Sequence, residues 1–301
     1  MFEYFVYGHK LISNIRLHIL ESFNGQTTID FIIFTVHIDK SIKYNSNRTI
    51  ETFFDDNKCI LTLGNKTTYI IEPFKNRIKV ITSDFIWMES TFLNLPFAIF
   101  FALKNMLLLH ASTLIDYNNI AIPLCANKGV GKTTTSIGLS NFFDFYSDDT
   151  LLINLENNKL NCYFGTKFIK LNKDTFSLMN SNKKFENFKK NIQGKAYYNF
   201  GKEIKEISGA YINKLYFLKR EWGETRMDTI SHPFKKKMYL HINICGTSTL
   251  GYEYCKIIEK NIVFDYIISN VEFFKLTLKD DLKYFGETIK SAKRLIDNTI
   301  N

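Results

Sequence analysis

The sequence predicts a mixed α/β protein, with a β-rich N-terminal lobe over residues 1–85 and a larger domain of helices and strands over residues 86–301. Apolar and polar residues alternate along much of the first 85 residues, which is typical of strands. Residues 120–141 then place an apolar run, a glycine-rich turn and a helical pattern in succession. A chain of 301 residues, 45% of them hydrophobic, is long enough for two domains or one large one.

Strands of the N-terminal lobe are expected where the alternation is bounded by clusters of Asn, Asp and Gly. These strands cover residues 2–7, 28–37, 59–63, 67–71 and 77–81, and we expect them to form an antiparallel sheet. Residues 85–106 follow with apolar side chains close to helical spacing, including Trp87 and Ile99, so we expect one largely buried helix there. This helix leads into the strand that carries His110.

Elements after residue 141 are expected from the same periodicities. The predicted strands are 142–146, 150–155, 161–164, 168–171, 211–218 and 272–278, and the predicted helices are 173–180, 252–259 and 280–296. Residues 181–195 are rich in Lys and Asn, which favours a mobile loop near a substrate. Lys183, Lys184, Lys189 and Lys190 in this loop would attract an acidic or carboxylate-terminated peptide.

Composition excludes several protein classes. The chain has only four prolines and no internal repeat, and its longest apolar runs are too short to span a bilayer. The opening MFEYFVYGHK lacks the apolar core of a signal peptide, so we expect a cytoplasmic protein with no membrane partner. The five cysteines are scattered without the short paired spacing that suits zinc, and we expect reduced, mostly buried thiols.

The net charge of +9 is spread along the chain, with lysine runs at 183–184, 189–190 and 235–237. Such runs are typical of solvated faces, so an acidic substrate is favoured over nucleic acid as the binding partner. The sequence leaves the oligomeric state open, and a homo-oligomer is one of the alternatives.

The segment ANKGVGKT, from Ala126 to Thr133, has the spacing of a phosphate-binding loop, with Ala126 in place of the first glycine. Gly129 and Gly131 allow positive φ and a close approach to phosphates. Backbone N–H groups at the start of the next helix form an anion site, from which Lys132 reaches the β and γ phosphates and Thr133 ligates Mg²⁺. The predicted ATP-binding residues are Asn127, Lys128, Gly129, Val130, Gly131, Lys132, Thr133 and Thr134.

Two adjacent acids, Asp148 and Asp149, follow the first strand after the loop, and His110 lies on the strand before it. In isolation, such an acid pair is more often a solvated turn and such a histidine a core residue. Beside a phosphate loop, the two acids can supply the base and the metal contact needed when a hydroxyl attacks a γ-phosphoryl group. The combination with the loop favours the functional interpretation.

Several segments resemble one family. The order LLLHAS, ANKGVGKTT, FYSDD, GTKFIKL and INKLYFLKRE is similar to the catalytic domain of HPr kinase/phosphorylase, whose fold is related to that of ATP-dependent phosphoenolpyruvate carboxykinase. The stretches YFVYGHKLISNI and TTYIIEPFKNRIKV resemble the β-rich N-terminal part of stand-alone HPr-kinase-like proteins found beside peptide-modification genes. The resemblance spans most of the chain and implies a P-loop catalytic domain of the HPr kinase/phosphoenolpyruvate-carboxykinase type over residues 86–301.

The resemblance also implies roles for individual residues. His110 matches a histidine that lies beside the γ-phosphate and the metal. Asp148 matches the acid that takes the proton from the acceptor hydroxyl, and Asp149 matches the acid at the metal. The predicted catalytic residues are therefore Asp148, His110 and Lys132, and the predicted metal ligands are Thr133 and Asp149.

Two further positions have weaker matches. Glu206 corresponds to a glutamate in an E-x-R-G element of the family, but Ser208 replaces the arginine of that element. Arg220 is either a cation on the phosphate side of the site or a surface arginine at a strand end.

These features predict a P-loop phosphotransferase, namely an ATP-dependent, Mg²⁺-requiring kinase that acts on a hydroxyl. A serine of a small protein or peptide is the favoured acceptor, and a small-molecule acceptor is the alternative within the same class. A nucleotide-gated regulatory or binding module without turnover is the alternative from another class. The intact Lys132, Thr133 and acid pair favour catalysis, while Ser208 and the long N-terminal lobe argue against the HPr enzyme itself.

Overall fold

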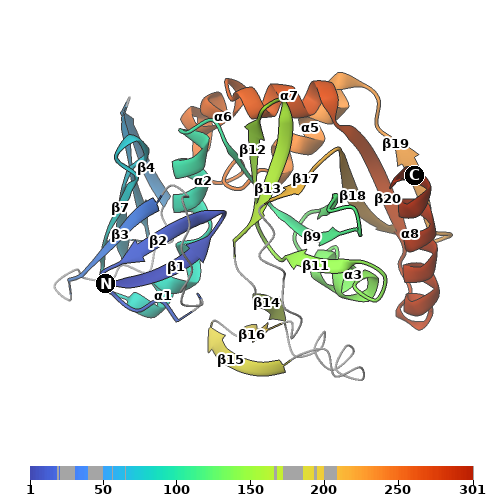
Figure 1. Cartoon of the computed structure of the whole chain (residues 1–301), viewed down its shortest axis with the longest axis horizontal. Coiled ribbons are helices and arrows are strands. Elements are labelled where there is room, and N and C mark those ends of the chain that lie inside the picture. The colour runs from blue at the N-terminus through green and yellow to red at the C-terminus, as the bar shows by residue number, and fades with distance from the viewer. Residues whose placement is uncertain are drawn as a thin grey trace. The chain divides into compact units, whose positions relative to one another are not determined.

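The computed structural model describes residues 1–18, 20, 31–39, 50–55, 57–64, 66–165, 168–171, 186–192, 195–199 and 209–300. These residues form several sheets and helices, which is the mixed α/β architecture expected from the sequence (Figure 1). Contacts divide the chain into two compact units. Unit 1 comprises Met1–Leu108, Leu152–Asn154 and Ile244–Asp265, and unit 2 comprises Leu109–Leu151, Leu155–Asn243 and Tyr266–Asn301. This division differs from the expected ranges of 1–85 and 86–301, since each unit draws on several stretches of chain.

Unit 1 contains a seven-stranded sheet with the order β1-β2-β3-β7-β6-β5-β4. Its strands are β1 (Phe2–Val6), β2 (His9–Ser13), β3 (Phe31–Ile38), β4 (Ile50–Asp55), β5 (Lys58–Leu63), β6 (Thr67–Glu72) and β7 (Arg77–Thr82). Strand β3 runs parallel to both β2 and β7, while the other neighbours are antiparallel. The expectation of a purely antiparallel sheet is therefore wrong. Side chains alternate between the two faces in parallel and antiparallel strands alike, so the alternation in the sequence does not reveal strand direction.

Two helices form where the sequence predicts one helix over residues 85–106. Helix α1 (Phe85–Thr91) begins at Asp84, whose side chain accepts a 3.0 Å hydrogen bond from the backbone N–H of Trp87. Helix α2 (Leu95–Ala102) has Pro96 in its first turn and is buried from Pro96 to Ala102. The prediction of one continuous helix is wrong because proline lacks an N–H group and clashes with the carbonyl four residues earlier. Unit 1 also contains the short 3-10 helix η1 (Pro73–Lys75) and helix α6 (Gly251–Glu259), which confirms the helix expected at 252–259.

Unit 2 is built on a six-stranded sheet with the order β11-β9-β10-β18-β20-β19. Its strands are β9 (Ala111–Ile115), β10 (Ala121–Cys125), β11 (Asp144–Ser147), β18 (Lys214–Glu221), β19 (Arg226–Thr229) and β20 (Glu272–Lys279). Strands β10, β18 and β20 run parallel to one another, and β9, β11 and β19 are antiparallel to their neighbours. Every residue of β9 and β10 is buried, as expected for strands covered on both faces of a sheet.

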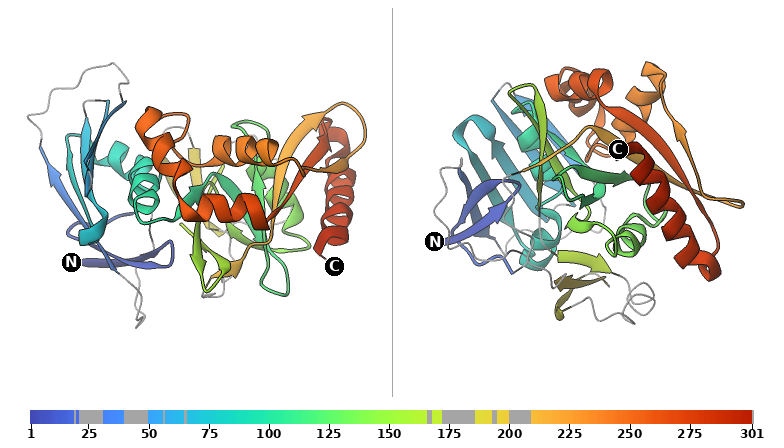
Figure 2. Two further views of the ribbon diagram at one scale, coloured as in Figure 1. Left: turned by 90° about the horizontal axis from the view of Figure 1, so that it is seen from above. Right: turned by 45° about the vertical axis from the view of Figure 1, so that its right-hand side comes forward.

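Helices α3 (Lys132–Leu139) and α8 (Phe285–Ile300) pack on one face of this sheet and share one hydrophobic core (Figure 2). The two helices approach each other closely at Gly138, where a Cβ atom would lie 2.8 Å from Ile289 Cδ1. The helix expected at 280–296 begins later than predicted, since the 3-10 helix η3 (Leu282–Tyr284) precedes α8.

Helix α5 (Pro233–Asn243) packs on the opposite face of the six-stranded sheet. The ring of Tyr239 on α5 contacts Phe217 on β18, with ring centroids 5.0 Å apart. The hydroxyl of the preceding strand residue, Tyr216, forms a 2.7 Å hydrogen bond with the hydroxyl of Thr299 on α8. Successive side chains of β18 therefore point to opposite faces of the sheet, one toward α8 and the next toward α5. Helix α5 and helix α7 (Ile262–Asn270) are not among the elements expected from the sequence. In the described ranges, no helix combines the length and the hydrophobicity needed to cross a membrane.

Two smaller sheets are also present among the described residues, with the orders β17-β13-β12-β8 and β14-β16-β15. Their strands are β8 (Leu107–Leu109), β12 (Leu151–Glu156), β13 (Lys159–Phe164), β14 (Phe168–Leu171), β15 (Glu186–Ile192), β16 (Lys195–Asn199) and β17 (Ala210–Tyr211). The expectation of a loop over 181–195 is wrong for β15, which pairs with β16. A polar strand such as this one depends on its pairing partner rather than on its own composition. The helix expected at 173–180, Lys183 and Lys184 lie outside the described residues.

Candidate functional site

The loop between β10 and α3 has the backbone that its sequence requires. Gly129 and Gly131 have φ values of 89° and 97°, and α3 begins directly after Gly131. Positive φ within the loop is confined to these two glycines, so Ala126 occupies the first position without left-handed backbone strain. The loop therefore ends at a helix N-terminus, where free N–H groups favour an anion.

Lys132 lies folded back over the loop that precedes it. Its Nζ donates a 2.8 Å hydrogen bond to the carbonyl oxygen of Ala126, and the residue is only 9% exposed. The ammonium is thus held between the first and last parts of the loop. A buried ammonium at this place is a strong point charge for a bound phosphate.

Asp148 and Asp149 are adjacent in sequence but face different partners. Thr133 Oγ1 donates a 2.9 Å hydrogen bond to Asp148 Oδ1, and Asp148 is 3% exposed. Asp149 has a φ of 71°, and its Oδ1 lies 3.3 Å from His110 Nε2. The side chain of Asp149 is 32% exposed, so solvent and substrates reach it more easily than Asp148. The left-handed backbone at Asp149 accounts for the different directions of the two carboxylates, and Asp tolerates this conformation better than most residues.

A layer of small hydroxyl side chains lies beneath α3. Ser112 Oγ of β9 and Ser136 Oγ of α3 are 2.6 Å apart, and Ser112 Oγ also donates to the Ser147 carbonyl oxygen at 3.4 Å. Ser147 Oγ donates a 2.6 Å hydrogen bond to the Thr150 carbonyl oxygen. Ser112, Ser136 and Ser147 are fully buried, so these bonds tie the first turns of α3 to the strand that precedes the acid pair.

Arg220 at the end of β18 contacts the loop from the side. Its Nε donates a 2.8 Å hydrogen bond to the Val130 carbonyl oxygen, and a Cβ atom on Gly131 would lie 3.1 Å from its Nη2. Of the two interpretations that the sequence leaves open, the surface arginine does not account for this contact. A guanidinium has five N–H donors, so Arg220 adds positive charge next to the loop while it holds the loop in place.

The backbone of His110 is anchored to α5. Its N–H donates a 2.7 Å hydrogen bond to the carbonyl oxygen of Asn243, the last residue of that helix. Asn243 is itself buried, and its side-chain amide donates to the Tyr239 carbonyl oxygen at 2.8 Å. The sequence contains no signal for this contact, because α5 follows His110 by more than a hundred residues.

The donor set at the loop fits a nucleotide phosphate with a divalent cation. Lys132, Arg220 and the N-terminus of α3 suit the phosphate, while the Thr133 hydroxyl and the two aspartates offer the oxygen ligands that Mg²⁺ prefers. Within the described ranges, no group of three or more His, Cys, Asp or Glu side chains could hold a metal by itself. A cation here would need phosphate oxygens as further ligands, which is the usual arrangement for Mg²⁺ at phosphate sites.

The other candidate residues of the sequence analysis lie on the same loop and helix or outside the described residues. Asn127 and Lys128 are exposed on the loop, and Thr134 is half-buried on α3. Glu206 and Ser208 lie outside the described residues. Cys125, which ends β10, is buried, and burial raises the pKa of its thiol to about 12, so it remains protonated at neutral pH.

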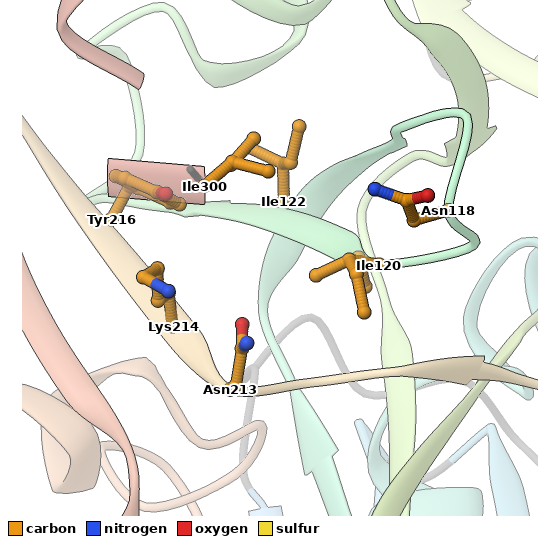
Figure 3. A pocket seen from close by; sticks show the side chains of 8 residues that line it. Asn118, Ile120, Ile122, Asn213, Lys214, Tyr216 and Ile300 are labelled. Atoms are coloured by element: carbon orange, nitrogen blue, oxygen red, sulfur yellow. The ribbon is translucent and has the colours of Figure 1, made fainter. Parts of the chain in front are cut away.

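A small pocket lies elsewhere in unit 2, near the beginning of β10 (Figure 3). Its lining includes Asn118 and Ile120 before β10, and Lys214 and Tyr216 on β18. The phosphate-type loop follows the other end of β10, and the pocket lining contains none of the site residues predicted from the sequence.

Comparison with known proteins does not assign this chain to a family. No protein-family model and no curated protein matches this chain. Among solved structures, the HPr(Ser) kinase/phosphatase from Coxiella burnetii aligns with 64% of this chain and 97% of its own, with a TM-score of 0.33 and 10% sequence identity. This is a distant structural similarity, and it carries no argument about activity, so the functional assignment rests on the geometry of the loop and the acid pair.

Proposed function

We propose that this protein is an ATP-dependent kinase that transfers the γ-phosphoryl group to a hydroxyl, with a serine of a small protein or peptide as the acceptor. The observation that supports this most strongly is the hydrogen bond between Thr133, which directly follows the loop lysine, and Asp148. This bond joins the loop that would bind phosphate to the acid pair that would complete the chemistry. A solvated turn would not place a 3% exposed aspartate against α3.

In this proposal, the loop and its cations bind the triphosphate. The N–H groups at the start of α3 and the ammonium of Lys132 contact the phosphates, and Lys132 exchanges its bond to the Ala126 carbonyl for phosphate oxygens. Arg220 keeps the Val130 carbonyl turned away from the phosphates and so keeps an acceptor oxygen out of the anion site. Thr133 and Asp148 would hold Mg²⁺, which would supply positive charge to the phosphate oxygens.

The geometry favours Asp148 as the metal ligand of the acid pair and Asp149 as the base. In phosphate-loop enzymes, the hydroxyl that ligates Mg²⁺ and an aspartate share the metal, and Asp148 is the acid bonded to Thr133. Asp149 is the more exposed acid and lies against His110, so it is better placed to accept a proton from an entering hydroxyl. The family resemblance implies the reverse assignment, and the two assignments predict different variant kinetics.

The proposal predicts that Lys132→Ala weakens ATP binding about tenfold to a hundredfold, because a charge-assisted hydrogen bond contributes about 1.5–3 kcal/mol. Calorimetry with ATP and Mg²⁺ measures the affinity. Lys236→Ala is the matched control, since it also removes an ammonium bonded to a backbone carbonyl, at 2.7 Å from the Val271 oxygen, but away from the loop. Equal ATP affinity in wild type and Lys132→Ala would remove the basis of the proposal.

Turnover is tested separately with γ-labelled ATP and serine-containing peptides from a cognate extract. Transfer of label to a peptide by wild type, and not by Lys132→Ala, is the expected result. Tight ATP binding without transfer to any acceptor in the extract would instead favour a nucleotide-gated binding module.

A further inference from the structure

Helix α5 presents three of its large apolar side chains to solvent, while Leu240 is buried and Tyr239 contacts Phe217 of the sheet. Phe234, Met238 and Ile242 are 69%, 47% and 51% exposed, respectively. They are spaced four residues apart, which places them in one stripe along a helix, and this stripe is here called the α5 stripe.

The inward side of α5 is polar in part, which makes the arrangement unusual for a surface helix. Lys236 points inward, where its Nζ donates hydrogen bonds to the carbonyl oxygens of Ile268 and Val271 at 3.3 and 2.7 Å. The same ammonium lies 5.2 Å from the centroid of the Phe273 ring. The inward side of α5 therefore combines this lysine with Tyr239 and the buried Leu240, and three large hydrophobic side chains remain exposed. Contiguous exposed apolar side chains of this kind are typical of interaction sites.

The α5 stripe ends next to the candidate catalytic site. Ile242 directly precedes Asn243, whose carbonyl oxygen accepts the 2.7 Å hydrogen bond from His110 N. The helix has 11 residues and is about 16 Å long at 1.5 Å per residue. A segment bound along α5 would thus run from the first turn of the helix to the backbone of the residue that faces Asp149.

Charge on α5 selects the kind of segment that can bind. Lys235 and Lys237 are exposed, and helical spacing places them on the two sides of the stripe. A second copy of this chain, with a net charge of +9, is disfavoured by repulsion. An acidic partner is attracted.

We propose that the α5 stripe is the docking surface for the phosphoryl acceptor, namely an amphipathic helical segment of a small protein or peptide with one apolar face and acidic flanks. This inference rests on the proposed kinase function, and it specifies how the acceptor is recognised. An apolar helix face laid against a complementary helix face is a common mode of peptide recognition.

The test uses the full chain and a synthetic fluorescein-labelled helical peptide of about 15 residues, about one turn longer than the 11 residues of α5. The peptide carries Leu on one face, Glu on both flanks and one Ser near an end. Anisotropy in the absence of nucleotide gives its affinity for wild type, Met238→Asp, Ile242→Asp and the control Ile86→Asp. Ile86 is a similarly exposed isoleucine, at 56%, on α1. A second peptide has Lys in place of Glu, and a fluorescent ATP analogue measures nucleotide affinity in each variant.

We expect the two stripe variants to bind the Glu peptide at least about tenfold more weakly, because central apolar residues dominate such interfaces. Ile86→Asp should match wild type, the Lys peptide should bind at least about tenfold more weakly, and ATP affinity should be equal in all variants. With ATP, Ile242→Asp should raise the KM for the Ser peptide at an unchanged kcat.

Several results would overturn the proposal. The Glu peptide could fail to bind wild type, or it could bind all variants equally. The Lys peptide could bind wild type as tightly as the Glu peptide does. Sedimentation could also show that wild type is a dimer and that Met238→Asp dissociates it. Loss of binding to phosphatidylserine vesicles in the stripe variants, without any peptide binding, would assign the surface to a membrane. Peptide affinity is measured without nucleotide, so it does not depend on ATP binding. A failure to bind ATP would therefore count against the proposed function but would not change the test of peptide docking.

Discussion

Replacing each aspartate of the pair by asparagine tests how the site divides its chemistry. Asp148→Asn keeps an oxygen that can accept the 2.9 Å hydrogen bond from Thr133 but removes the negative charge. A hydrogen bond or contact to a charged group contributes about 1.5–3 kcal/mol, and each 1.4 kcal/mol is tenfold in affinity. We therefore expect Asp148→Asn to weaken Mg²⁺-dependent ATP binding about tenfold to a hundredfold.

Asp149→Asn should behave differently, because the Asp149 carboxylate lies 3.3 Å from His110 Nε2 and is more exposed than Asp148. We expect ATP affinity within about threefold of wild type and a rate of phosphoryl transfer lower by about 10²–10⁴, the usual contribution of a general base. Calorimetry with Mg²⁺ or with EDTA measures the metal-dependent affinity, and single-turnover transfer of labelled phosphate measures the rate.

The opposite outcome would refute the assignment made from the geometry. If Asp149→Asn loses Mg²⁺-dependent affinity while Asp148→Asn keeps it and loses only the rate, the roles are those that the family resemblance implies. Thermal unfolding of both variants is the control, since a large common loss of stability would make the pair structural.

Two further predictions concern the glycines of the loop and the loss of folding stability at low pH. Gly129→Ala and Gly131→Ala should each destabilise the fold by about 1–2 kcal/mol because of their positive φ. Gly131→Ala should weaken ATP binding more than Gly129→Ala, since its Cβ would also meet Arg220 at 3.1 Å, whereas a Cβ at Gly129 meets no protein atom within 4 Å. Denaturant unfolding and calorimetry check this pair, and equal ATP affinity in both variants would contradict the part assigned to Arg220. Hydrogen bonds from Lys75 and then Arg77 lower the pKa of Glu72 below its ordinary value of 4.5, so its contribution to stability is present above pH 4.5 and is lost as the pH falls below that value. Glu72→Gln should therefore flatten the loss of stability below pH 4.5 in denaturant titrations, and an unchanged acid limb would be evidence against this.

The sequence by itself determined the features that depend on neighbouring residues. The strand, loop and helix at residues 120–141 are confirmed, because glycine at positions 129 and 131 meets the positive φ that the turn needs. The acid pair, Asp148 and Asp149, is likewise evident in the sequence as two aspartates directly after a predicted strand. Alternating and apolar runs predicted most strands within a few residues, since burial on one or both faces imposes those patterns locally.

Only the tertiary structure decided what these elements meet. Strand direction in the first sheet, the pairing that makes β15 a strand and the contact of Arg220 with Val130, 90 residues apart, all depend on long-range pairing. The side chains of Asp148 and Asp149 diverge because of one left-handed residue and the positions of Thr133 and His110. Local chemistry specifies which conformations a short segment can adopt, whereas the partner of a side chain depends on the packing of segments that are distant in sequence.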